Sequence, residues 1–302
     1  MTGAIGSIII SGNPVTDYED FLLNLSPTDA PGYAEARFSN YAPLTRAEGG
    51  WWATTFAVFA RELILKELYE NALGRDVEVW GYGLEPNFEG RIEELVFALP
   101  PDRFTKSLRT LANKAHMRAD VDGDGEVDRS TVIENTESQG LYGTAEGIMS
   151  GGQLSSSLVA DQTIQSLVDL RSLPQPAVAL GGGSGGIASV ELVVRGYITT
   201  LGRRLYNQTL VEGTQSLSSQ VEDVIDDVGE FIESIDTDTN TTAVTQEYDV
   251  DRKADSIVFD LPRLGDSGNN RWLLDCYGRD CTTVIGRRAY LHQAAPVRPP
   301  TA

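Results

Sequence analysis

The chain has few residues of the kinds that most metal and acid–base chemistry uses. Its 302 residues include two cysteines and two histidines, His116 and His292. Two cysteines are too few for a disulfide framework. Two histidines limit the number of imidazole groups that can bind a metal or act as an acid–base catalyst. No run of about 18 apolar residues is present, so no transmembrane helix is expected. The first residues lack a basic region and an apolar core, so we do not expect a secretory signal. We expect the chain to be synthesised in a cytoplasm.

Basic residues are also scarce relative to acidic ones. The chain holds 24 Lys and Arg against 44 Asp and Glu, a net charge of -20 with an isoelectric point near 4.4. Nucleic acids and anionic membranes bind proteins through Lys and Arg, so this balance argues against both kinds of partner. The hydrophobic fraction of 41% is ordinary, so 302 residues suffice for about two domains with buried cores.

The acidic residues are concentrated in residues 216–255. This segment holds twelve acids against the two bases Arg252 and Lys253, which is half of the net charge of the whole chain. One interpretation is a solvated helix face followed by a loop. The other is an acidic wall that repels a polyanion or faces a basic partner.

Alternating apolar residues predict a β-rich N-terminal unit. The expected elements are strands over residues 7–10, 52–58, 77–80 and 90–99 and a helix over residues 61–73. Gly74 is placed to end that helix. The strands at 77–80 and 90–99 form a hairpin that Pro100 and Pro101 close.

The next segment is expected to form a strand, a turn and a helix. Residues 112–118 alternate between apolar and polar side chains, and residues 154–172 carry a helical stripe with Ser155–Ser157 available as caps. We expect Leu141 and Tyr142 to anchor the core of this middle unit.

The last part of the sequence mixes both kinds of periodicity. The expected elements are a strand over 187–198, a helix over 217–235, and strands over 256–261 and 271–276. Gly181–Gly186 is a flexible linker or hairpin tip, because it lacks the Gly-Lys-Ser/Thr ending of a phosphate loop. The whole pattern predicts an α+β fold that is rich in β-structure.

Residues 120–128 resemble a calcium loop. Asp120, Asp122, Asp124 and Asp128 supply alternating carboxylates, and Gly125 stands at the sixth position, as an EF-hand-type loop requires. The twelfth position is Thr131 in place of a bidentate acid. The alternative is a tight β-hairpin turn built from Asp-Gly-Asp-Gly.

Cys276 and Cys281 flank Gly278-Arg279, a pair that fits a two-residue hairpin turn. The cysteines then face each other across two strands. A disulfide is geometrically feasible, whereas a cytoplasmic origin favours free thiols. Zinc is disfavoured because no second Cys or His pair completes four ligands.

No catalytic motif accompanies these elements. The sequence has no Gly-x-Ser-x-Gly elbow and no histidine with an obvious partner, and a carboxylate pair brought together in space leaves no sequence signal. We therefore expect no enzymatic activity and assign no catalytic, cofactor-binding or metal-binding residue.

Three groups of segments carry a resemblance to a known family. They are residues 50–52 with 74–92; residues 113–118 and 154–174 with the block Glu137-Ser138-Gln139-Gly140-Leu141-Tyr142-Gly143; and residues 193–201 with 265–272. In order and spacing they resemble the hub or distal tail proteins of tailed bacteriophages, a group that includes the trimeric baseplate hub of contractile phages.

The resemblance implies tandem tail-tube-like β-barrels: an N-terminal one over residues 1–111, a middle unit over 112–178, and a C-terminal one over 179–302 that carries the acidic helix 217–235. It also implies a trimer or ring in the virion tail. The implied partners are the tail tube protein, the tape-measure protein and the spike or fibre apparatus, with DNA passing through and no cofactor. An acid-lined conduit agrees with this role, because it does not hold phosphates.

Two other functions stay open. One is an extracellular or virion-surface carbohydrate- or receptor-binding module that uses Trp platforms and calcium at residues 120–128. The other is a soluble acidic enzyme that acts on a glycan.

Overall fold

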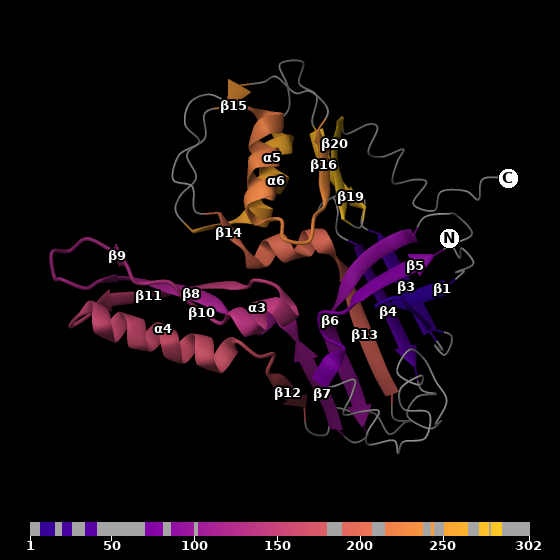
Figure 1. The fold of residues 1–302 in the computed structure, drawn as a ribbon, viewed down its shortest axis with the longest axis horizontal. Coiled ribbons are helices and arrows are strands. Elements are labelled where there is room, and N and C mark those ends of the chain that lie inside the picture. The colour runs from indigo at the N-terminus through magenta and orange to yellow at the C-terminus, as the bar shows by residue number, and fades with distance from the viewer. Residues whose placement is uncertain are drawn as a thin grey trace.

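The computed structural model describes residues 7–15, 20–25, 34–40, 70–80, 86–99, 102–179, 189–206, 215–237, 243–244, 251–264, 272–277 and 279–285. They form a mixed α/β protein whose sheets are mainly antiparallel. Figure 1 shows a large sheet, an arm that projects from it, and a C-terminal part above both.

The large sheet has the strand order β2-β1-β5-β6-β13-β4-β3, with β7 paired to β6 and β12 paired to β7. Its strands are β1 (Ser7–Ile10), β2 (Asn13–Val15), β3 (Asp20–Leu25), β4 (Ala34–Asn40), β5 (Asp76–Trp80), β6 (Pro86–Leu99), β7 (Asp102–Ser107), β12 (Pro176–Ala179) and β13 (Ser189–Gly196). The short 3-10 helix η2 (Leu108–Thr110) follows β7. The expected hairpin is confirmed, because β5 pairs antiparallel with β6. Among the described strands, the edges β2 and β3 do not pair with each other, so these pairings alone do not close a barrel.

Strand β13 lies inside this sheet, between β6 and β4. The strand itself was expected, but the boundary at residue 179 assigned it to a separate C-terminal barrel. The structure corrects that assignment: β13 is apolar at Leu192, Val193 and Val194, all buried, which is typical of a central strand covered on both faces. The chain therefore returns to the first sheet after the arm is complete.

The arm combines a small sheet with two helices. Its elements are β8 (Lys114–Asp120), β9 (Asp128–Arg129), β10 (Ile133–Glu134), α3 (Thr136–Tyr142), β11 (Glu146–Gln153) and α4 (Ser157–Arg171). Strand β11 runs parallel to β8, and β9 and β10 pair with β8 antiparallel. Ala115, Met117 and Ala119 alternate along β8 and pack against α4, whereas His116 and Arg118 belong to the opposite face.

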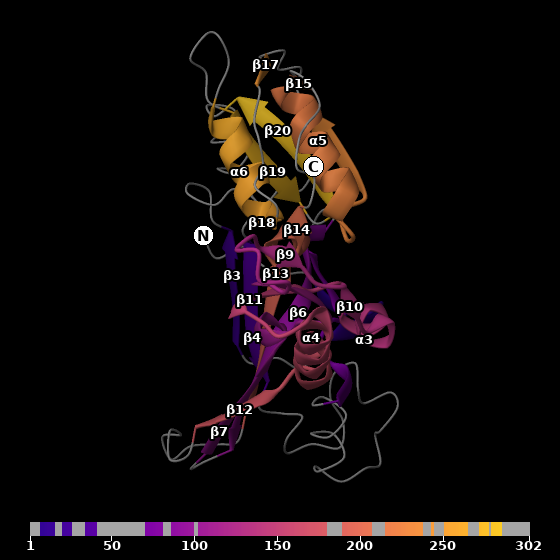
Figure 2. The same ribbon diagram turned by 90° about the vertical axis from the view of Figure 1, so that its left-hand side faces the viewer.

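The C-terminal part is a small α/β layer that lies above the arm in Figures 1 and 2. Its elements are η3 (Tyr197–Arg203), β14 (Leu205–Tyr206), β15 (Gln215–Ser216), α5 (Leu217–Val228), β16 (Ser234–Thr237), β17 (Ala243–Val244), β18 (Arg252–Lys253), α6 (Ala254–Arg263), β19 (Trp272–Tyr277) and β20 (Asp280–Ile285). Val221, Val224 and Ile225 of α5 share one core with residues of α6 and with Leu274 of β19.

Two expected elements differ in this part. The helix expected over residues 217–235 ends at Val228, because its C-cap Gly229 has a ψ of 56°, outside the helical region, and the chain then continues into β16. The strand expected over 256–261 is wrong. It lies within α6, where Ala254, Ile257, Val258 and Leu261 recur at helical spacing and are all buried.

Several predicted segments lie outside the described residues. These are the strand at 52–58, most of the helix at 61–73, and Gly181–Gly186. Gly74 has a φ of 81°, in the left-handed region that suits a residue just after a helix.

Candidate functional site

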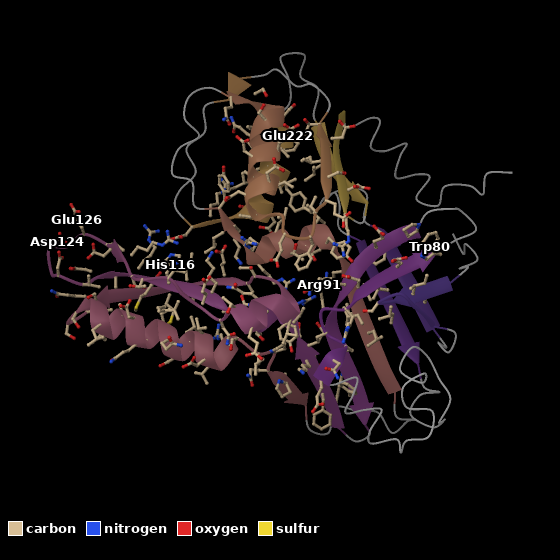
Figure 3. The ribbon with its side chains drawn as sticks, viewed as in Figure 1. Trp80, Arg91, His116, Asp124, Glu126 and Glu222 are labelled. Carbon is tan, nitrogen blue, oxygen red and sulfur yellow. The ribbon has the colours of Figure 1, made fainter. Side chains whose placement is uncertain are left out.

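The large sheet, the arm and the C-terminal part meet around Arg91 of β6, which is labelled in Figure 3. This side chain is 2% exposed. Its Nη2 donates to the Gly74 carbonyl oxygen at 3.1 Å, and its guanidinium carbon lies 4.3 Å from the centre of the Phe231 ring. Burial, and secondarily the charge of Arg203, lowers the pKa of the Arg91 guanidinium. The Phe231 ring provides the electron-rich face that a buried cation needs.

The contact extends into a column of four side chains. The rings of Phe231 and Tyr197 stack with centres 6.1 Å apart and an angle of 21° between their planes. The Arg279 guanidinium carbon lies 4.4 Å from the centre of the Tyr197 ring. The column therefore joins four parts of the chain. In the order Arg91–Phe231–Tyr197–Arg279, these are β6, the segment after α5, η3 and the turn between β19 and β20.

Asp76 of β5 closes the outer end of this column. Its Oδ1 accepts a 2.8 Å hydrogen bond from the Tyr197 hydroxyl, and its Oδ2 accepts one from Arg279 Nη2 at 3.3 Å. Burial, followed by the charge of Asp76, raises the pKa of Tyr197 well above its usual value. Since the phenol stays protonated, it remains a hydrogen-bond donor to the carboxylate.

Ion pairs tie the same parts together around the column. Arg203 Nη2 lies 2.8 Å from Glu93 Oε1 of β6. Glu146 of β11 lies 3.1 Å from Lys114 Nζ and 3.6 Å from Arg204 Nε. The Glu146 side chain is 5% exposed, so this bridge between the arm and the C-terminal part is shielded from solvent.

The block 138–143, which the sequence singled out, lies beside the column. Buried Asn113 donates from Nδ2 to the Ser138 hydroxyl and to the Gly143 carbonyl, and it accepts from the Ala145 N–H. Gly143 has a φ of 76°, and a Cβ there would lie 2.6 Å from the Phe231 ring. Glycine is therefore required at this close approach.

The two residues expected to anchor the middle unit behave differently. Tyr142 is buried, with 8% of its surface exposed. Leu141 is 58% exposed, so its expected core role is wrong. Helix α3 spans seven residues and covers its neighbours with one face, which leaves the residue just before Tyr142 on the other.

His116 has a partner that the sequence did not reveal. Its Nε2 lies 3.0 Å from Asp251 Oδ2, and its Nδ1 lies 3.4 Å from Arg129 Nη2. Arg129 is a donor only, so this arrangement places the imidazole proton on Nε2, which donates to Asp251. Asp251 has a φ of 72° and a side chain that is 3% exposed. The pair fastens β8 to the chain just before β18.

The Asp120–Asp128 segment forms the hairpin turn at the tip of the arm (Figure 3). Asp120, Asp122 and Asp124 bring oxygens within 4.8 Å of one another. They accept hydrogen bonds from the backbone N–H groups of the turn itself, at Gly123, Asp124, Gly125 and Glu126. Thr131, at the twelfth position, bonds to Asp161 of α4. Strands β8 and β9 pair antiparallel, so the segment is a hairpin, but its connection over residues 120–127 is longer than the tight turn that was expected. Calcium binding stays the open alternative.

The Cys276 hairpin is also confirmed. Strands β19 and β20 are antiparallel, and their register places Cys276 opposite Cys281. The choice between disulfide and free thiols stays a prediction.

Exposed apolar side chains gather on the arm. The large hydrophobic residues with more than about a third of their surface exposed are, among the described residues, Val127, Val132, Leu141, Ile148, Leu158, Val159, Leu170, Leu173 and Leu264. All except Leu264 belong to the arm or to the turn that follows α4. Where such side chains form a contiguous patch on the surface, they are typical of an interaction site.

No protein-family model and no curated protein sequence matches this chain. None of the described helices combines the length and hydropathy that crossing a bilayer requires.

Proposed function

We propose that this chain is a structural virion protein of a phage tail, a hub or tail-tip component. In this role it closes the tail tube, adapts it to the spike or fibre apparatus and lets DNA pass. The observation that carries the proposal is the exposed apolar surface of the arm, which suits an assembly contact more than a substrate site. The resemblance in the order and spacing of the sequence segments is the reason for proposing that this assembly is a phage tail.

The junction around Arg91 supports an assembly role. It fixes the C-terminal part to the large sheet through the buried column and the Arg203–Glu93 ion pair, and it fixes the arm to the C-terminal part through the Arg204–Glu146 ion pair. A rigid arm presents its contact surface in one orientation, which lowers the entropy lost when subunits associate. In the proposed ring, the large sheet belongs to the first tube-like barrel and the C-terminal part to the second.

The charge of the chain also agrees with this role. A net charge of -20 disfavours retention of DNA, which a conduit must release. Asp223, Asp226 and Asp227 of α5 are exposed, so part of the acidic segment 216–255 is a solvated helix face. Proposed partners are further copies of the chain, the tail tube and tape-measure proteins, and the spike or fibre proteins. Enzymatic activity, specific nucleic-acid binding and membrane insertion are not part of the proposal.

The test is the mass and shape of the purified full chain. Native mass spectrometry should give a trimer or a larger three-fold assembly, and negative-stain electron microscopy should show a ring with a central opening. An assembly without three-fold symmetry, or a monomer at the highest soluble concentration, would contradict the proposal.

The convergence of Asp120, Asp122 and Asp124 favours a second candidate, a calcium-assisted carbohydrate- or receptor-binding module. Thermal unfolding with calcium, with magnesium and with a chelator tests it. A calcium-specific rise in Tm that is lost in Asp122→Asn would support this function, and equal Tm values in all three conditions would reject it.

A further inference from the structure

One face of the β5–β6 hairpin turns toward the C-terminal part and is lined by charged residues. Asp76 of β5 lies directly opposite Arg91 of β6, and Glu78 lies directly opposite Glu89. Directly opposite residues share a face of the sheet, and the apolar residues that alternate with them are buried on the other face. The β19–β20 hairpin lies above the charged face, where Arg279 bonds to Asp76 (Figure 1).

Glu78 and Glu89 are a pair of like charges within this face. The β-carbons of directly opposite residues in antiparallel strands lie about 4.5–5.5 Å apart, and like charges at that spacing destabilise the strand pair. Glu78 Oε2 accepts a 2.8 Å hydrogen bond from the indole N–H of Trp80, which is labelled in Figure 3. That bond holds the Glu78 carboxylate within the face, beside Glu89.

Glu89 differs from its neighbouring acids because it has no cationic partner. Asp76 pairs with Arg279 at 3.3 Å, and Glu93 pairs with Arg203 at 2.8 Å. Glu89 forms no ion pair with any described residue, and its carboxylate accepts a hydrogen bond from the backbone N–H of Arg279 instead. Glu89 therefore contacts the β19–β20 hairpin directly, but no side-chain cation neutralises it there.

Acids outnumber cations around this carboxyl group. The groups that face Glu89 are two acids, one cation and one phenol: Glu78 of β5, Asp280 of β20, Arg279 of the turn before β20, and Tyr197 of η3. Arg195 of β13 lies opposite Arg91 instead. Burial is the main cause that raises the pKa of Glu89, the two acids raise it further, and the contact with Arg279 opposes them.

We propose that Glu89 makes the contact between the β19–β20 and β5–β6 hairpins sensitive to protons, so that mild acid holds the two hairpins together more firmly than neutral solution. A proton on Glu89 removes the repulsion from Glu78 and Asp280, and it leaves a carbonyl oxygen that still accepts from the Arg279 N–H. The C-terminal part then docks on the large sheet with a stability that depends on pH. This inference goes beyond the proposed function, because it concerns a single chain.

The direction of the effect follows from the protonation of Glu89 in the folded and unfolded chain. An unfolded glutamate titrates near about 4.3, and folded Glu89 binds its proton at a higher pH. The stabilisation is therefore complete below the unfolded value, and it is lost as pH rises through the pKa of folded Glu89. At neutral pH the ionised carboxylate weakens the contact.

The first test is urea unfolding of the full chain between about pH 5 and about pH 8, above its isoelectric point near 4.4. Glu89→Gln keeps the size and the acceptor oxygen of the side chain but carries no charge. It should have a higher urea midpoint than the wild type at the upper pH, and the gap should narrow toward the lower pH. Glu94→Gln is the control on the same strand: Glu94 pairs with Arg109 at 3.9 Å, so its loss should not stabilise the chain at either pH.

Hydrogen exchange with mass spectrometry locates the effect. After correction for the intrinsic exchange rate at each pH, β19 and β20 should be better protected in the wild type at the lower pH, and equally protected at both pH values in Glu89→Gln. Helix α4 of the arm should not distinguish the two proteins.

Three results would overturn the proposal: equal pH slopes in the wild type and Glu89→Gln, a less stable Glu89→Gln at the upper pH, or a change in protection shared equally by α4 and the β19–β20 hairpin. If Glu89→Gln does not fold, Glu78→Gln removes the other acid and should flatten the pH slope of the wild type, and an unchanged slope would be equally decisive. None of these readings depends on the oligomeric state, so this proposal and the tail-hub proposal fail separately.

Discussion

Helices α4 and α5 both bury an apolar inner face, but they expose different kinds of residue on their outer faces. Each buries one apolar face: Ile164 and Val168 in the arm, and Val224 and Ile225 in the C-terminal part. Outside, α5 exposes Asp223, Asp226 and Asp227, whereas α4 exposes Leu158 and Leu170 beside one exposed acid, Asp169. Since both belong to one acidic chain, general solubility does not explain the difference. We infer that the outer face of α5 is in contact with solvent and that the outer face of α4 contacts a partner.

The inner faces give the largest expected effects. Ile164→Ala and Ile225→Ala each remove three carbons from a site that is at most 3% exposed. Each should lower the free energy of unfolding by about 2–5 kcal/mol. Urea unfolding measures both, and the two losses should be alike because both isoleucine side chains are almost completely buried. A loss below about 1 kcal/mol in one of them would show that its core is loosely packed.

The Arg91–Phe231 contact of the junction joins the C-terminal part to the large sheet. Phe231→Leu keeps an apolar side chain but removes the ring that covers Arg91, so stability should fall by about 1–2 kcal/mol. Phe231→Tyr is the matched control that keeps the ring. A double-mutant cycle with Arg91→Met isolates the pair, and a coupling energy near zero would show that the ring and the cation are independent.

The sequence predicted best what local periodicity encodes. The β5–β6 hairpin, the hairpin of Cys276 and Cys281, and the apolar face of α5 were all expected. Ile257, Val258 and Phe259 were mistaken for a strand, because three adjacent apolar residues fit a strand or a buried helix equally well. The helix becomes evident when Ala254 and Leu261 are included.

The junction had no local signal. Arg279 and Asp76 are 203 positions apart, and His116 and Asp251 are 135 apart. Periodicity detects which face of an element is buried, but it does not identify the element that covers it. Gly143 was the available clue, because a glycine in a turn can mark a close approach of the backbone to another group. The partner ring, Phe231, follows from the tertiary fold alone.

The outer faces can be exchanged to test the comparison. Asp223→Leu with Asp226→Leu gives α5 two exposed leucines, as α4 has. Because both positions are exposed, the change in unfolding free energy should stay within about 0.5 kcal/mol. Sedimentation should instead reveal new, concentration-dependent association. Asp223→Asn with Asp226→Asn removes the same charges without adding apolar surface. If this variant associates equally, charge alone governs contact, and the leucines of α4 lose their special role.

The smallest expected effect is that of the acidic residues of α5 on the pKa of the buried Tyr206. Burial, followed by the charges of Asp223 and Asp227, raises the pKa of Tyr206 from 10.0 to about 12. Between these values the folded protein holds a proton that the unfolded chain has released, so stability falls as pH rises through this window. Unfolding between pH 9 and about 11.5 should show a shallower decline in Tyr206→Phe than in the wild type. Asp227→Asn should fall between them, because it removes one of the two charges and leaves the burial unchanged. Equal slopes in all three would mean that other groups govern the alkaline loss and that the acids of α5 act on solvent alone.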